Sequence, residues 1–170
     1  HLTTRRQRQM CIRDSYESDP LYIDALVNSI NKKINEISWK PDLIIASYHG
    51  IPKKYFDKGD PYHCYCHKTT RLISEKFTSI EIKTTFQSRF GPQEWLQPYT
   101  DKTLENLPKE GVKNVLTICP GFASDCVETL EEIQIQAKES FLNSGGENFD
   151  MIPCLNDNNC LLYTSDAADE

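Results

Sequence analysis

Strand-like and helix-like segments alternate along this chain of 170 residues. Short apolar or β-branched runs predict strands over residues 43–47, 79–86, 114–119 and 149–154. Helical spacing of apolar residues or helix-start signals predict helices over residues 19–38, 60–77, 100–110 and 124–142, with Ser124 or Asp125 as the cap of the last one. Such alternation is typical of an α/β fold, and it predicts a parallel sheet with helices on both faces.

Each predicted strand runs into a polar or turn-rich loop at its carboxyl end. In chain order these loops read SYHGIP, QSRFGP, PGFASD and LNDNN. Because the carboxyl ends of parallel strands meet at one edge of the sheet, the loops are expected to lie together there. The sequence therefore predicts one ligand site assembled from several loops.

The first of these loops carries a histidine, His49, directly after a buried strand. The chain then turns away at Gly50 and Pro52. An imidazole moves a proton or binds a metal near neutral pH, so a histidine at a rigid strand end is a candidate for either task. A lone histidine in this position is only a hint of chemistry.

Three carboxylates mark the start of the last predicted helix. Asp125, Glu128 and Glu132 stand at i, i+3 and i+7, so on a helix they share one face. A bound cation is one reason to align like charges. The alternative is that acids in a first helical turn stabilise the helix dipole, which explains Asp125 and Glu128 better than Glu132.

The pentad His63-Cys64-Tyr65-Cys66-His67 raises a metal-site hypothesis. On a helix His63 and His67 lie one turn apart, which is a chelating spacing, whereas Cys64 and Cys66 point away from each other. No second Cys/His pair at zinc-like spacing completes a four-ligand set. A structural zinc or an iron–sulfur cluster is therefore less favoured than cysteines that act as small buried hydrophobes.

The loop after the second strand offers candidate substrate contacts. Arg89 could pair with an anionic substrate group, although solvation of a loop is the commoner role. Trp95, Phe90 and Tyr99 could wall a flat aromatic ligand, although core packing is the default for such side chains.

Composition narrows the class of protein. The formal net charge of −6 and the pI near 5.3 argue against nucleic acid or an anionic membrane surface as a partner. No apolar run approaches the roughly 18 residues of a membrane-spanning helix, and no signal peptide is evident. The seven cysteines lack a regular framework, which fits a reducing compartment and predicts a cytoplasmic protein. Residues 1–14 and 160–170 lack periodicity and are expected to be artefactual flanks of a domain covering 15–159.

Four motifs resemble the bacterial ferrochelatase family, in family order. They are SYHGIPKKYFDKGDPY, TTFQSRFGPQEWLQPYTDKTL, CPGFASDCVETLEEI and IPCLNDNN. The resemblance covers about residues 16–159 and corresponds to the carboxy-terminal half of that enzyme. It implies one lobe of a two-lobed fold, truncated before the final helices, and insertion of Fe²⁺ into protoporphyrin IX to give haem. On this basis the chain alone is expected to be inactive.

The resemblance also implies roles for particular residues. His49 matches the family's active-site histidine, and Glu128 matches the acidic residue that faces it across the porphyrin cleft; both are catalytic and metal-binding candidates. Glu132 and Asp125 are candidates for a metal or proton path, and Tyr48, Arg89 and Trp95 are candidate substrate contacts. Gln136 stands where some relatives carry a carboxylate. Fe²⁺ is expected as substrate, with no required cofactor.

Metalation of a porphyrin must strip water from Fe²⁺ and remove two protons from pyrrole nitrogens. Imidazole and carboxylate suit a divalent ion that must be handed on, because thiolates hold soft metals more tightly. Whether His49 or Glu128 accepts the proton or binds iron stays open at this point. Two alternatives also stay open: a related chelatase for another metal or tetrapyrrole, and a non-catalytic metal- or haem-binding module.

Overall fold

The core of the protein is a four-stranded parallel sheet. A computed structural model describes residues 16–157, and the expected flanks 1–14 and 160–170 lie outside this described part. The strands are β1 (Leu43–His49), β2 (Glu81–Gln87), β3 (Asn114–Ile118) and β4 (Asn148–Met151). They are ordered β2-β1-β3-β4, and every neighbouring pair is parallel, as predicted.

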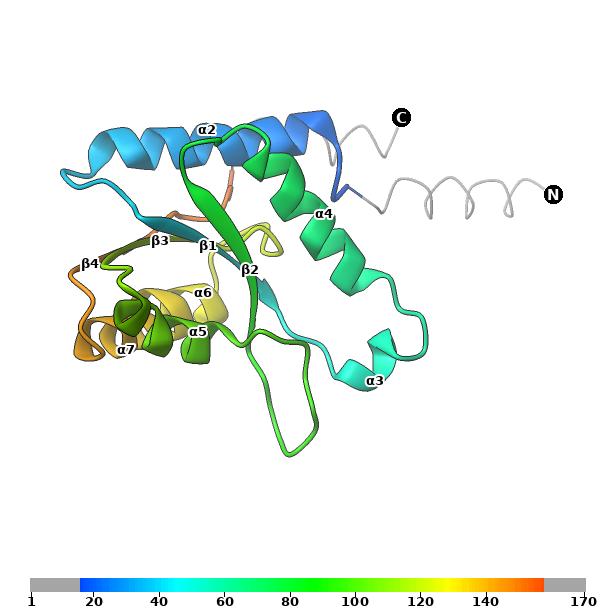
Figure 1. The fold of residues 1–170 in the computed structure, drawn as a ribbon. Coiled ribbons are helices and arrows are strands. Elements are labelled where there is room, and N and C mark those ends of the chain that lie inside the picture. The colour runs from blue at the N-terminus through cyan, green and yellow to red at the C-terminus, as the bar shows by residue number, and fades with distance from the viewer. Residues whose placement is uncertain (1–15, 158–170) are drawn as a thin grey trace.

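Two helices, α2 (Pro20–Glu36) and α4 (Tyr62–Ser74), cover one face of the sheet (Figure 1). The Asp19 carboxylate caps α2 by accepting hydrogen bonds from the next free backbone N–H groups, at Leu21 and Tyr22. The apolar stripe of α2 includes Ile23, Leu26 and Ile30, and it is buried against β1 and β3. This packing excludes water from one side of the sheet.

The opposite face is covered by a second group of helical segments (Figure 1). These are α5 (Thr100–Asn106), the 3₁₀ turn η1 (Leu107–Glu110), α6 (Val127–Leu130), the π-helical segment η2 (Glu132–Ala137) and α7 (Lys138–Asn143). Leu104, Ile133 and Phe141 are fully or almost fully buried there, and they pack in one cluster with the β3 and β4 side chains. Helices on both faces confirm the predicted fold class.

Local details differ from the sequence prediction in three places. The helix expected over 124–142 is a succession of α6, η2 and α7, and its N-cap is Cys126 rather than Ser124 or Asp125. Thr129 explains the later start, because its hydroxyl accepts the Cys126 backbone N–H at 3.0 Å. A short helix, α3 (Lys53–Phe56), was not predicted.

The carboxyl ends of β1 and β2 are in register, with His49 opposite Gln87. Gly50 follows β1, and its N–H donates to the Gln87 carbonyl oxygen at 2.7 Å. A Cβ atom at Gly50 would lie 2.9 Å from that same oxygen, so only glycine allows this close turn without a shift. None of the helices between residues 16 and 157 combines the length and the apolar character that crossing a membrane requires.

Candidate active site

His49 is the last residue of β1, and a hydrogen bond to the next residue fixes its ring. Its Nδ1 lies 2.6 Å from the Gly50 carbonyl oxygen. Because a carbonyl oxygen only accepts, Nδ1 carries the proton in this contact, and Nε2 of the neutral ring keeps its lone pair. The Tyr62 hydroxyl donates to the His49 carbonyl at 2.9 Å and holds the backbone from the α4 side. The half-buried imidazole is therefore oriented as a proton acceptor or metal ligand.

Gln87 connects β1, β2 and the start of α6. Its side-chain oxygen accepts the Ser47 hydroxyl at 2.7 Å, and its Nε2 donates to the Glu128 carbonyl at 2.7 Å. The residue is 5% exposed, so both bonds are shielded from water. Gln87 thus fixes the distance between the strand edge that carries His49 and the helix that carries Glu128.

Glu128 lies in the first turn of α6, and its side chain is near His49. Its pKa is lowered, first by its own backbone N–H at the helix start, then by Cys126 and by the charge on His49. Free N–H groups at a helix N-terminus favour a negative charge. The carboxylate therefore stays ionised through the neutral range, which suits a metal ligand.

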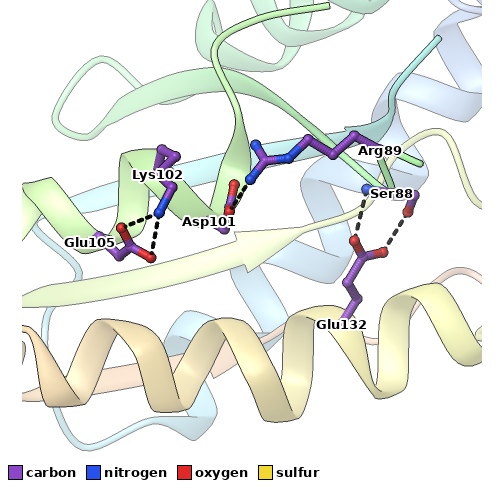
Figure 2. Close-up of polar contacts among 6 residues, drawn as sticks. All are labelled: Ser88, Arg89, Asp101, Lys102, Glu105 and Glu132. Atoms are coloured by element: carbon purple, nitrogen blue, oxygen red, sulfur yellow. Dashed lines mark hydrogen bonds and ion pairs between the residues drawn. The ribbon is translucent and has the colours of Figure 1, made fainter. Parts of the chain in front are cut away.

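Glu132 reaches from η2 to the end of β2 (Figure 2). Its carboxylate accepts the Ser88 backbone N–H at 2.8 Å and the Ser88 hydroxyl at 2.5 Å. Ser88 has a positive φ of 61°, a backbone conformation that is uncommon for residues other than glycine. The two bonds hold this conformation and keep Glu132 at the same edge as Gln87 and Glu128.

Asp125 is engaged elsewhere. Its carboxylate accepts hydrogen bonds from Asn156 Nδ2 at 2.8 Å, the Cys154 backbone N–H at 3.1 Å and the Thr129 hydroxyl at 3.3 Å. Burial is the largest influence on its pKa and acts to raise it, but these donors together outweigh burial, so the pKa is lowered. The expectation that Asp125 shares a helix face with Glu128 and Glu132 is wrong, because α6 begins only at Val127.

Arg89 follows Ser88 and forms an ion pair with Asp101 of α5. Its guanidinium donates to Asp101 at 2.6 Å (Figure 2). The guanidinium carbon also lies over the Tyr99 ring, 4.2 Å from the ring centre. The Lys102–Glu105 ion pair lies beside it on α5. A cavity of about 350 Å³ is lined by Arg89 and Asp101, together with Gln87, Ser88, Glu132 and Gln136. Arg89 is thus placed at the rim of the candidate site, with its charge already balanced by Asp101.

The two remaining candidate contacts differ in accessibility. Tyr48 is 3% exposed, and its hydroxyl bonds with that of Thr70 at 3.0 Å, which places the ring among the side chains of α4. Trp95 is half-buried beside the turn after β1, and its indole N–H donates to the Phe90 carbonyl at 3.1 Å. The Leu96 N–H donates to the Ile51 carbonyl at 3.0 Å, so the two loops support each other.

The pentad His63-Cys64-Tyr65-Cys66-His67 lies in the first turns of α4, where its two cysteines differ in burial. Cys66 is buried in the core, whereas Cys64 is exposed. Within residues 16–157, no three His, Cys, Asp or Glu side chains group so as to hold a metal ion. The pentad therefore does not assemble three or more ligands.

Sequence reasoning missed Gln87 and Ser88. The available signal was the position of a polar Gln-Ser pair at the end of a strand whose preceding residues are apolar or β-branched. Such a pair is common in loops. The residues around it in the sequence therefore do not indicate that it contacts Glu128 and Glu132 in a distant helical segment.

The fold and the site together define a class of protein. It is an α/β domain that binds its ligand at the carboxyl ends of the strands, here beside a histidine and ionised carboxylates. The family model described as Ferrochelatase matches residues 2–163 of this chain. The chain belongs to the ferrochelatase family.

Curated relatives agree with this assignment. Ferrochelatase from Rhizobium meliloti (strain 1021) is 62% identical over 144 residues, which are 84% of this chain and 42% of the relative. Ferrochelatase from Rhizobium etli (strain CIAT 652) is 55% identical over 92% of this chain and 46% of the relative. Ferrochelatase from Brucella ovis is 57% identical over 84% of this chain and 41% of the relative. The chain thus spans somewhat less than half the length of these relatives.

Proposed function

We propose that the protein containing this chain inserts Fe²⁺ into protoporphyrin IX, with His49 and Glu128 facing each other across the reaction site. The observation that carries the proposal is the hydrogen bond from His49 Nδ1 to the Gly50 carbonyl. It leaves Nε2 as the free basic atom of the ring, and His49 interacts electrostatically with Glu128, whose pKa is lowered. Membership of the ferrochelatase family supports the same reaction.

The reaction exchanges two pyrrole protons for one Fe²⁺ ion, so the site must accept protons and bind a dication. The lowered pKa of Glu128 makes its carboxylate a weak base but leaves it charged at neutral pH. A charged carboxylate suits a hard or borderline divalent ion. We therefore assign the first pyrrole proton to His49 Nε2 and the iron contact to Glu128, a division that sequence alone left open.

Supporting roles follow from position at the same sheet edge. Glu132 is proposed to hold or pass protons or metal, because it lies beside Gln87 and Ser88 at the cavity. Asp125 remains a predicted member of this path, although its three hydrogen bonds favour a role in holding the segment around Asn156. Arg89, Trp95 and Tyr48 remain predicted substrate contacts; exposure at the cavity favours Arg89 over the buried Tyr48.

A cytoplasmic location is proposed from the acidic charge and from five free cysteines in the described residues, which fit a reducing compartment. Iron and protoporphyrin are the proposed substrates. The same charge balance favours neither nucleic acid nor an anionic membrane surface as a partner.

The test uses the full-length protein, because the chain spans less than half of its relatives. His49→Ala is expected to lower kcat for Fe²⁺ insertion about 10²–10⁴-fold, the range for loss of a positioned acid–base group. Glu128→Gln removes the charged carboxylate proposed to contact iron and is expected to lower kcat as well. Glu131→Gln, an exposed neighbour on the same helical run, is the matched control and should keep activity within about twofold.

Full turnover by His49→Ala would contradict the assignment of the base. Parallel assays with Co²⁺ and Zn²⁺ across several tetrapyrroles separate a chelatase for another metal or ring from the proposed one. The 170-residue chain alone should show no turnover, since much of the porphyrin site is expected in the missing half.

A further inference from the structure

Two histidines of α4, His63 and His67, lie together outside the candidate active site. Their ring centres are 4.4 Å apart, one helical turn along the same face. Within the described residues neither ring makes a hydrogen bond or an ion pair, although most polar side chains around them do. Their contacts are instead aromatic: His63 stacks on Phe86 at 5.6 Å and touches Phe56 at 4.9 Å.

The separation of the rings matches chelation of one ion. An imidazole nitrogen binds a divalent metal at about 2.1 Å, which places the ring centre about 3.2 Å from the ion. Two rings at a right angle about the ion then have centres about 4.5 Å apart, whereas tetrahedral placement gives about 5.2 Å. The observed 4.4 Å agrees with the right-angle arrangement of octahedral and tetragonal ions.

The surroundings keep both rings ready to bind. Burial lowers the pKa of His63, and burial together with the charge of His63 lowers that of His67. Both imidazoles are therefore neutral at pH 7.5 and each has a free lone pair. The stack on Phe86, which is 2% exposed, restricts the His63 ring and reduces the entropy lost on binding.

The cysteines of the pentad do not contribute. Cys66 lies in the core, 3% exposed, and burial raises its pKa to about 12, so it is a thiol at neutral pH. Cys64 is exposed but forms no three-ligand group with the histidines. Water must fill the remaining coordination positions, which suits an ion that exchanges rather than a structural one.

We propose that His63 and His67 form a two-histidine site for a late first-row divalent cation such as Ni²⁺, Cu²⁺ or Co²⁺. The site is separate from His49 and Glu128, but it is near them along the fold. Tyr62, the residue before His63, donates its hydroxyl to the His49 carbonyl. An ion held here would stand at the amino end of α4, beside the turn that carries His49.

The test is calorimetric titration of the untagged 170-residue chain with Ni²⁺ at pH 7.5. The sequence holds only four histidines, namely His1, His49, His63 and His67, so each can be assessed. His63→Gln and His67→Gln should each weaken the site at least tenfold, because a single imidazole loses the chelate. Cys64→Ser, on the same helix, is the matched control and should bind as the parent does.

Binding within twofold of the parent in either histidine variant would overturn the proposal. A second measurement on the parent guards against misfolded variants. Ni²⁺ at less than one equivalent should broaden the ring signals of His63 and His67 first in ¹H–¹⁵N spectra. Earlier broadening of His1 or His49 would also overturn it. The result is independent of iron insertion, since neither measurement involves a porphyrin.

Discussion

Replacing Gln87 with leucine tests whether this side chain holds the two halves of the candidate site together. Leucine has nearly the same volume but no polar atoms. The change removes the bond from the Ser47 hydroxyl and the bond to the Glu128 carbonyl, both 2.7 Å long. Ser47 keeps Thr100 as a partner at 2.8 Å, so the greater loss falls on the Glu128 carbonyl.

The expected cost follows from burial. A buried hydrogen bond whose partner is left unsatisfied costs about 1–3 kcal/mol, and one whose partner is satisfied elsewhere costs about 1 kcal/mol. The free energy of unfolding should therefore fall by about 2–4 kcal/mol. With a urea dependence of about 2 kcal/mol/M, the midpoint should fall by about 1–2 M.

The assay is equilibrium urea unfolding followed by far-UV circular dichroism. Gln93→Leu is the matched control, because Gln93 is exposed in the loop after β2 and the change there should stay within about 0.5 kcal/mol. If Gln87→Leu unfolds at the same urea concentration as this control, the connecting role of Gln87 is refuted.

Two further predictions concern titration and thiol reactivity. The pKa of Asp125 in the folded protein lies below its ordinary value of 3.8, so the ionised carboxylate stabilises the fold above pH 3.8, and this stabilisation is lost as the pH falls through the folded pKa. The difference in the free energy of unfolding between the parent and Asp125→Asn should therefore shrink between pH 5 and pH 2.5. Urea unfolding at each pH measures this difference. A constant difference across that range would contradict the lowered pKa. In the second, iodoacetamide at pH 8 should alkylate the exposed Cys64 and spare the buried Cys66 until urea is added, as read by peptide mass spectrometry. Equal labelling of both thiols in the native protein would place Cys66 outside the core.

Local patterns were sufficient for the strand and helix order. Apolar runs such as Leu43–Ala46 can only be buried, and the Asp19-Pro20 signal begins a helix wherever it is followed by helical spacing, so both predictions needed no distant partner. The position of His49 at a strand end followed from the same reasoning. The α6 boundary was less predictable, because Ser124, Asp125 and Cys126 are adjacent and contacts with Thr129 and Asn156 decide between them.

The sequence by itself determined the fold class and the family, and it placed His49 and Glu128 as the residues of interest. Only the tertiary structure decided that Gln87 joins them, that Ser88 holds Glu132 and that Asp125 turns away to Asn156. These contacts connect residues about 30 to 45 positions apart. Periodicity and capping report only on neighbours within a few turns, whereas a contact across the sheet edge depends on how the strands are ordered and where each loop ends.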